Sequence, residues 1–273
     1  MKTYVIPTDF SAAANNAVEY GAKLAKKTNG QLQLINIKLT DPDGLVVEPE
    51  NFSYNRTTPD ILDDMSNTIR DTFAVPCSYM VDRTDVIFEK SIERLTKEND
   101  LIVMGTNGAD DLFQYFFGSN TYHVIENVKC PVLVVPENSN YKPIKKVVYA
   151  WDYKPANKTA FLQMYFLLKA FNPEIVLLHI SRKDTEVSND VFQAIKGDIE
   201  MLGNELTNIK FDRIIWENQD DFADKMIEYI SDTGADILSV AHYERAFFQR
   251  IFRGNIIRKL TDTLDYPLLV LQA

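Results

Sequence analysis

Short apolar runs alternate along the chain with longer stretches whose apolar residues recur at helical spacing. Runs such as residues 101–104 and 132–135 show no polar alternation, which is typical of strands buried on both faces of a sheet. Helix-boundary residues stand between the runs. Ser11 predicts the N-cap of a helix over about residues 12–28, and Asn29 followed by glycine predicts its end.

Two further helix starts are visible in the first half of the chain. Thr58 followed by Pro59 predicts an N-cap and the first helical turn. Asp85 precedes Ile87 and Ile92, which together with a later leucine form one apolar helical face. Each half therefore reads as strands and helices in strict alternation, β-α-β-α-β-α-β-α-β, which predicts a parallel sheet covered on both faces.

Four apolar runs of the first half recur in the second half in the same order. The first two recur 143 residues later and the last two 136 residues later; in the first half they begin at Tyr4, Gln33, Asp100 and Cys130. Four matches in one order indicate a tandem duplication. The offset falls by seven, so the first copy is longer by seven residues, which we place in the polar stretch 40–58.

Residues 137–143 form a polar segment without periodicity, and the domain boundary falls there. We therefore expect one domain over residues 1–140 and a second over residues 141–273, each a doubly wound α/β fold. The connection is too short for a free linker, so we expect the two domains to be packed together.

Composition and charge exclude several classes of protein. The 273 residues carry 29 Lys and Arg against 39 Asp and Glu, a net charge of −10, which argues against a nucleic-acid binder and against a polybasic membrane-surface protein. Two cysteines, Cys77 and Cys130, have no CxxC spacing, which argues against a disulfide scaffold and against a zinc finger. The sequence shows no leader-like apolar segment and no apolar run near the ~18 residues of a membrane span, so we expect a cytoplasmic protein.

A glycine-containing loop follows the predicted strand 101–104. It holds Gly105, Gly108 and, nine residues later, Gly118 with Ser119. Glycines let a phosphate approach backbone N–H groups, and the helix that Gly118 and Ser119 would open presents unsatisfied N–H groups to an anion. The spacing fits neither a Rossmann nor a Walker motif. From the residues alone, a phosphate cradle and a merely structural turn both stay open.

At these residues the chain resembles the universal stress proteins. The resemblance rests on residues 7–11 (PTDFS), 100–106 (DLIVMGT) and 130–136 (CPVLVVP), and on the loop spacing from Gly105 to Ser119. It covers the whole chain as two tandem domains. It implies a stress-response protein that binds an adenine nucleotide, built of flavodoxin/Rossmann-like domains, each with a five-stranded parallel sheet in the order 3-2-1-4-5.

The resemblance also implies a set of site residues in the first domain. Asp9 and Ile37 would line the adenosine. The ribose and phosphates would contact Gly105, Gly108, Gly118, Ser119 and Asn120, with Asn107 in the same loop. The strand ends would contribute Pro7, Thr8 and Met104.

The loop departs from the family pattern in its charge. Between Gly108 and Gly118 it has two acids, Asp110 and Asp111, and no base, whereas family members that bind ATP often have basic residues there. Two carboxylates repel a polyphosphate unless solvent or Mg²⁺ intervenes. ATP, with or without Mg²⁺, and AMP therefore both stay open as the ligand.

The second copy has lost most of the loop motif. At the offset of 136 its positions are Ala241, Glu244, Gly254 and Asn255, so two of the three glycines and the serine are missing. We predict that the second domain is a pseudo-binding domain that completes a dimer-like unit with the first.

The leading hypothesis from the sequence is a nucleotide-binding protein and not an enzyme. Slow ATP hydrolysis or phosphotransfer is one alternative, and a ligand-free interaction scaffold is the other. We find no catalytic set beyond Asp9 and no metal-ligand spacing among His123, His179 and His242. The expected partners are the adenine nucleotide and the second domain, with a homodimer left open.

Overall fold

The computed structural model covers the chain of 273 residues and describes most of it. The described residues are 1–40, 57–106, 119–151, 155–182, 197, 208–216, 221–242 and 266–272. The chain forms two compact units, Met1–Tyr141 and Lys142–Ala273, called here the first and second unit.

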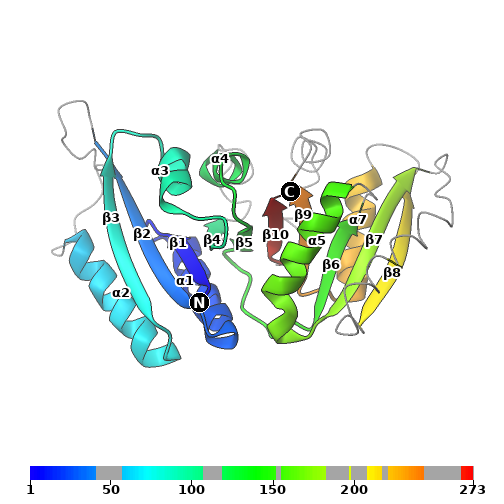
Figure 1. The fold of residues 1–273 in the computed structure, drawn as a ribbon, viewed down its shortest axis with the longest axis horizontal. Coiled ribbons are helices and arrows are strands. Elements are labelled where there is room, and N and C mark those ends of the chain that lie inside the picture. Colours follow the sequence, from blue (N-terminus) through cyan, green and yellow to red (C-terminus); the bar gives the residue numbers. More distant parts are fainter. Residues whose placement is uncertain are drawn as a thin grey trace. The chain divides into compact units, whose positions relative to one another are not determined.

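The first unit alternates strands with helices (Figure 1). Its elements are β1 (Thr3–Pro7), α1 (Ala12–Thr28), β2 (Gln31–Leu39), α2 (Thr58–Phe73), β3 (Cys77–Thr84), α3 (Phe88–Leu95), β4 (Leu101–Thr106), α4 (Ser119–Asn127) and β5 (Val132–Pro136). Neighbouring strands pair in parallel in the order β3-β2-β1-β4-β5. The predicted fold class and strand order are thereby confirmed.

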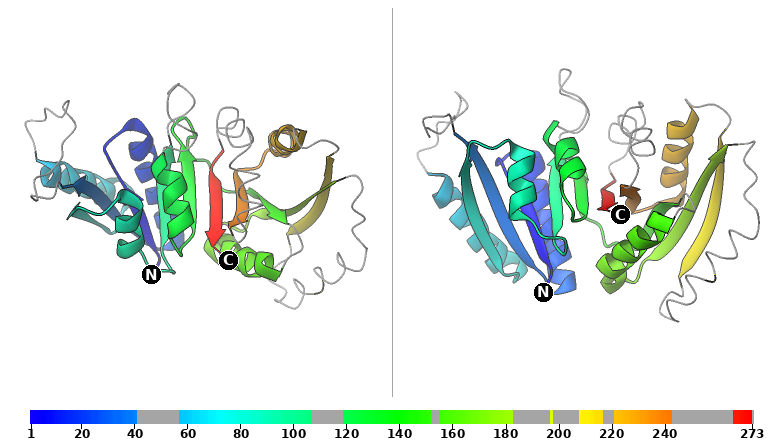
Figure 2. Two further views of the ribbon diagram at one scale, coloured as in Figure 1. Left: turned by 90° about the horizontal axis from the view of Figure 1, so that it is seen from above. Right: turned by 45° about the horizontal axis from the view of Figure 1, so that its top comes forward.

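The helices of the first unit cover both faces of its sheet. α1 contacts the central strands and α2, while α3 and α4 contact one another. This division follows from right-handed crossovers, because the connections that lead toward β3 and those that lead toward β5 place their helices on opposite faces. The further views in Figure 2 show the strands fanning out with the twist of a parallel sheet.

Helix α1 has the predicted bounds. The Ser11 side chain accepts a hydrogen bond from the backbone N–H of Ala14, and Asn29 ends the helix in the left-handed conformation (φ 52°). Left-handed C-caps are common because they let the last carbonyls find donors.

The starts of α2 and α3 differ from the predicted ones. The N-cap of α2 is Thr57 and not Thr58, because Thr57 forms a capping box with Asp60 in which each side chain bonds the other's backbone N–H. Helix α3 begins at Phe88, so Ile87 is its N-cap and stays exposed, while Ile92 is fully buried. The helical face predicted from Ile87 onward is thus one residue too long.

The second unit repeats the same topology in its described residues. Its elements are β6 (Lys146–Trp151), α5 (Pro155–Leu168), the 3-10 turn η1 (Lys169–Phe171), β7 (Glu174–Arg182), β8 (Ile209–Trp216), α7 (Asp221–Thr233), β9 (Ile237–His242) and β10 (Leu268–Gln272). The parallel order is β8-β7-β6-β9-β10, which matches the first unit strand for strand. The helices expected between β7 and β8 and between β9 and β10 lie outside the described residues.

The strands predicted to be buried on both faces are buried. Every residue of β5 is buried, and so is every residue of β4 except Gly105. Cys130, which comes just before β5, is also buried, as is Cys77 at the start of β3. None of the described helices is both long and apolar enough to cross a membrane.

Candidate functional site

The carboxyl ends of β1 and β4 meet at the point where the chain connections diverge. β1 pairs with β4 through Val5 and Ile102, and with β2 up to Pro7 and Ile35. The chain leaves β1 toward β2 and leaves β4 toward β5, so the two connections run in opposite directions. Doubly wound sheets bind ligands in the crevice at such a switch point. The predicted strand-end residues therefore lie where the topology places a ligand.

The turn between β1 and α1 holds Asp9 in a defined position. Its carboxylate Oδ1 accepts the backbone N–H of Ser11 at 3.0 Å, and Thr8 Oγ1 accepts that of Phe10 at 3.1 Å. Phe10 has a left-handed φ of 69°, which is uncommon for a bulky residue and persists where surrounding bonds determine the turn. Asp9 itself is exposed. The turn thus presents a fixed carboxylate to solvent.

Asp9 also decides what charge can bind at the start of α1. A helix N-terminus favours an anion, and the Asp9 carboxylate already stands there. A phosphate at the same place would be repelled. The turn therefore suits a ligand group that donates hydrogen bonds, such as an amine or a hydroxyl.

Gly105 is a glycine because α1 passes directly over it. A Cβ at this position would lie 2.1 Å from the carbonyl oxygen of Ala13 and 2.3 Å from its carbonyl carbon. No side chain fits against helix backbone at that distance. The glycine motif had two interpretations, a phosphate cradle and a structural turn. For Gly105 the close packing against α1 is a structural reason that needs no ligand.

The other loop residues are placed only in part. Met104 is buried at the end of β4. Helix α4 begins at Ser119, as expected, and Asn120 in its first turn is exposed. Asn107, Gly108 and Gly118 lie outside the described residues. The first turn of a helix such as α4 has backbone N–H groups without intrahelical partners, which is the feature that favours phosphate at a helix N-terminus.

Asn36 is a candidate site residue that the sequence pattern did not single out. It lies in β2 beside Ile37, is 5% exposed, and donates a hydrogen bond from Nδ2 to the carbonyl oxygen of Thr8 at 2.7 Å. Its Oδ1 has no hydrogen-bond partner among the described residues. The signal was present as a polar residue inside an apolar run, QLINI, but the run was interpreted only as a strand.

The second unit has a different side chain at the equivalent of Thr8. This is Trp151, whose ring packs edge-on against Tyr149 and Phe161 with centroids 5.8 and 5.9 Å from its neighbours. His179 Nδ1 lies 2.9 Å from the Trp151 carbonyl oxygen, and His242 Nδ1 lies 3.0 Å from Gln272 Oε1. Asp152 and the degenerate loop, residues 243–265, lie outside the described residues.

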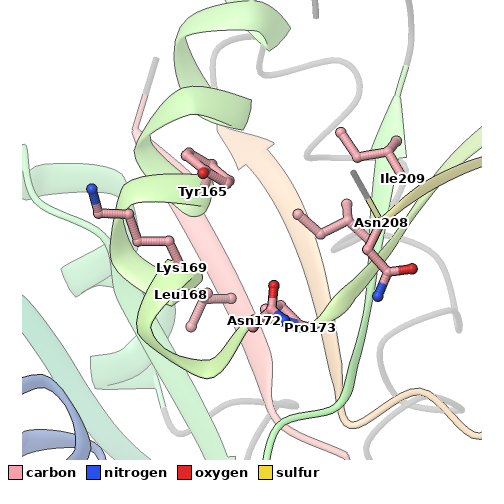
Figure 3. Close-up of a pocket in the computed structure, with 8 residues that line it drawn as sticks. Tyr165, Leu168, Lys169, Asn172, Pro173, Asn208 and Ile209 are labelled. Carbon is pink, nitrogen blue, oxygen red and sulfur yellow. The ribbon is translucent and has the colours of Figure 1, made fainter. Parts of the chain in front are cut away.

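A small open pocket in the second unit lies at the opposite end of its sheet (Figure 3). Tyr165, Leu168 and Lys169 line it from α5 and η1, with residues 172–173, Ile175 and residues 208–209 from the starts of β7 and β8. These are amino ends of strands, away from the switch point. The pocket therefore contains none of the predicted site residues.

The buried thiols of the first unit are poor nucleophiles. Burial raises the pKa of both Cys77 and Cys130 to about 11, so both are neutral thiols at neutral pH. Within the described ranges, no three His, Cys, Asp or Glu side chains gather closely enough to hold a metal ion.

Comparison with known proteins agrees with this fold. A sequence model described as "Universal stress protein family" matches residues 1–136. A universal stress protein of Methanocaldococcus jannaschii is 27% identical over 140 residues, which are 49% of this chain and 81% of that protein. Through its first unit, the chain belongs to the universal stress protein family.

Solved structures match the chain over nearly its whole length. A universal stress protein from Archaeoglobus fulgidus has a TM-score of 0.71 at 14% identity, covering 99% of this chain and 98% of that one. A functionally unknown protein from Pseudomonas aeruginosa PAO1 has a TM-score of 0.59 at 12% identity, covering 100% and 92%. At these identities the likeness shows the fold.

Proposed function

We propose that the first unit binds an adenine nucleotide, ATP or AMP, at the switch point, and that this binding serves a stress response. The observation that carries the proposal is the turn after β1. It holds the exposed Asp9 carboxylate beside the end of β4 in a unit that belongs to the universal stress protein family. The family resemblance implies the ligand, and the turn supplies a place for it.

The charges of the site favour one orientation of the nucleotide. Asp9 and Ile37 take the adenosine, because the carboxylate accepts hydrogen bonds and repels phosphate. The phosphates then lie at the start of α4, where Ser119 and Asn120 begin the helix. Met104, Pro7 and Thr8 form the strand ends between them, and the loop residues Gly105, Asn107, Gly108 and Gly118 complete the set.

The charge of the first unit favours a ligand whose phosphates are few or bridged. Residues 1–140 carry 12 bases and 20 acids, a net charge of −8, whereas residues 141–273 carry 17 and 19, a net charge of −2. Asp110 and Asp111 add to this within the loop. Either AMP or ATP bridged by Mg²⁺ satisfies the electrostatics.

The second unit is proposed to be a pseudo-binding domain. Its loop has Ala241 and Glu244 where the first unit has Gly105 and Gly108. The packing of the two units against one another, a homodimer and a cytoplasmic location stay predictions.

Catalysis is the weaker candidate. Hydrolysis needs a positioned base and a cationic clamp on the phosphates. Asp9 Oδ1 already accepts a backbone N–H, and residues 105–120 contain no Lys or Arg. Binding without turnover is therefore the function that we conclude.

Calorimetric titration of the full chain with AMP, ATP and ATP plus Mg²⁺ tests the proposal. We expect one nucleotide bound per chain. Asp9→Ala should weaken binding at least about tenfold, while Asp152→Ala, its matched change in the second unit, should leave it unaltered. Gly118→Val and Gly254→Val form a second matched pair with the same expectation.

Other outcomes each point elsewhere. Two nucleotides per chain would show that the second unit binds as well. No binding, together with no nucleotide in mass spectra of the purified protein, would leave the scaffold hypothesis. Phosphate release that scales with protein concentration and disappears in Asp9→Ala would make the protein an enzyme.

A further inference from the structure

Asn36 is a polar side chain on a face of β2 that holds two leucines before it and Lys38 after it. Leu32 and Leu34 precede it at alternate positions of the strand, and both are fully buried. Asn36 is also buried, and its Oδ1 has no hydrogen-bond partner among the described residues. A buried unpaired acceptor is unfavourable for folding, and a leucine would avoid it. The position therefore calls for a reason other than core packing.

The hydrogen bond from Asn36 to Thr8 replaces a bond of the β1–β2 ladder. The register of the two strands ends at Pro7 and Ile35, and the backbone N–H of Thr8 still reaches the Ile35 carbonyl at 2.8 Å. One step further, a parallel ladder would bring the backbone N–H of Ile37 to the Thr8 carbonyl. That carbonyl accepts Asn36 Nδ2 instead. The side chain thus ends the ladder while keeping the carbonyl satisfied.

The second unit also has a side-chain donor at the equivalent carbonyl, although there the β6–β7 ladder still includes this pair of residues. His179 stands in register with Trp151 on β7 and β6, as Asn36 stands one step past the register of Pro7 and Ile35. Since a carbonyl oxygen only accepts, the His179 Nδ1 bonded to the Trp151 carbonyl carries the proton. The Asn36 amide in the first unit and the His179 imidazole in the second each donate a hydrogen bond to the carbonyl at the equivalent position, Thr8 or Trp151. What the two residues share is the donor.

We propose that Asn36 is a positioning residue of the nucleotide site. Its amide holds the Thr8 carbonyl and thereby sets the direction in which the chain leaves β1. That direction fixes the turn in which Phe10 and Ser11 bond to Thr8 and Asp9. The proposal rests on the proposed function, because the turn presents Asp9 to the ligand.

Three substitutions distinguish the effect of losing the hydrogen-bond donor from the effect of changing the shape of the side chain. Asn36→Asp keeps the shape and, when ionised, offers only acceptors to a carbonyl that needs a donor. Asn36→His keeps a donor, as the second unit does. Gln31→Glu is the matched control, because Gln31 also donates from its side-chain amide to a β1 residue, Thr3 Oγ1 at 3.1 Å, at the opposite end of the strand pair.

The first measurement is calorimetric titration of each full-length variant with AMP. We expect Asn36→Asp to bind at least about tenfold more weakly than the natural sequence. Asn36→His and Gln31→Glu should bind within about threefold of it. If Asn36→Asp does not fold, Asn36→Ala, which removes the donor without adding a charge, takes its place with the same expectation.

The second measurement needs no ligand. Amide hydrogen exchange at Phe10 and Ser11 reports the turn, and it should be at least about tenfold faster in Asn36→Asp and unchanged in Asn36→His and Gln31→Glu. Unaltered exchange in Asn36→Asp, or exchange in Asn36→His as fast as in Asn36→Asp, overturns the proposal. If the natural sequence does not bind AMP or ATP, the proposed function fails, and the exchange rates alone decide the positioning role.

Discussion

At the scale of single residues, the identity of a side chain is decided by contacts between segments far apart in the sequence. The sequence predicts Gly105 as a member of a phosphate-binding glycine loop, and that role stays a prediction. Its requirement for glycine comes from Ala13, at the start of another element. The role of Asn36 likewise depends on the Thr8 carbonyl. Neither distance can be read from spacing along the chain, so the sequence pointed to the place and not to the reason.

Gly105→Ala should destabilise the first unit by about 3 kcal/mol, the upper range for an overpacked contact, because its methyl group would overlap the Ala13 carbonyl. Urea unfolding of the full chain measures the change. Gly197→Ala is the control, since a Cβ there meets no heavy atom of the described residues within 4 Å. Equal stability of the two variants would contradict the close approach.

The buried thiols predict how stability depends on alkaline pH. Burial raises the pKa of Cys77 and Cys130 from 9.0 to about 11, so the folded state keeps protons that the unfolded chain releases. The free energy of unfolding should therefore be unaffected by these groups below pH 9.0 and fall as pH rises toward about 11. Denaturant unfolding at a series of pH values checks this. A Cys77→Ala, Cys130→Ala variant should show a flatter dependence, and an identical slope would refute the assignment.

At the scale of elements, boundaries were predictable where one residue provides the whole signal. Ser11 and Asn29 end α1 as predicted, because capping depends on the side chain or backbone freedom of a single residue. The start of α2 was wrong by one residue, since two adjacent threonines offer the same hydroxyl and Asp60 decides between them. Ile87 was assigned to a helix it only precedes, because an apolar residue fits the periodicity on either side of a boundary.

Ser11→Ala should shorten or fray α1 at the candidate site. It removes the acceptor for the Ala14 N–H, 3.2 Å away, and should lower the free energy of unfolding by about 1 kcal/mol. Ser11→Thr keeps a hydroxyl and should stay close to the natural stability. Thermal unfolding monitored by circular dichroism provides the comparison. An alanine variant as stable as the threonine variant would mean that the cap contributes nothing.

At the scale of the whole molecule, repetition was the most informative feature of the sequence. The offsets of 143 and 136 indicated two copies, and the two units have the same strand order. Apolar runs predicted the buried parallel strands because such strands have no polar face. For the site, the sequence predicted which strand ends lie at the switch point, and the binding roles of the residues there stay predictions. Strand ends follow from topology, whereas the loop residues Asn107, Gly108 and Gly118 lie outside the described part of the chain.

Binding by one unit predicts an unequal response of the full chain to ligand. AMP at about 100 times its Kd should stabilise the first unit by about 2.7 kcal/mol and leave the second unchanged. Differential scanning calorimetry measures this, with Gly105→Ala used to identify the transition that belongs to the first unit. Equal shifts of both transitions would show that the second unit also binds.

The approach of Gly105 to Ala13 has a mechanical consequence. Backbone rests on backbone there, and densely packed interiors resist compression. Helix α1 and strand β4 therefore behave as one stiff body, with the turn that carries Asp9 at one side and the carboxyl end of β4 at the other. If the proposed function holds, a nucleotide that contacts both would meet a fixed span between them, so its length as well as its charge would decide whether it binds.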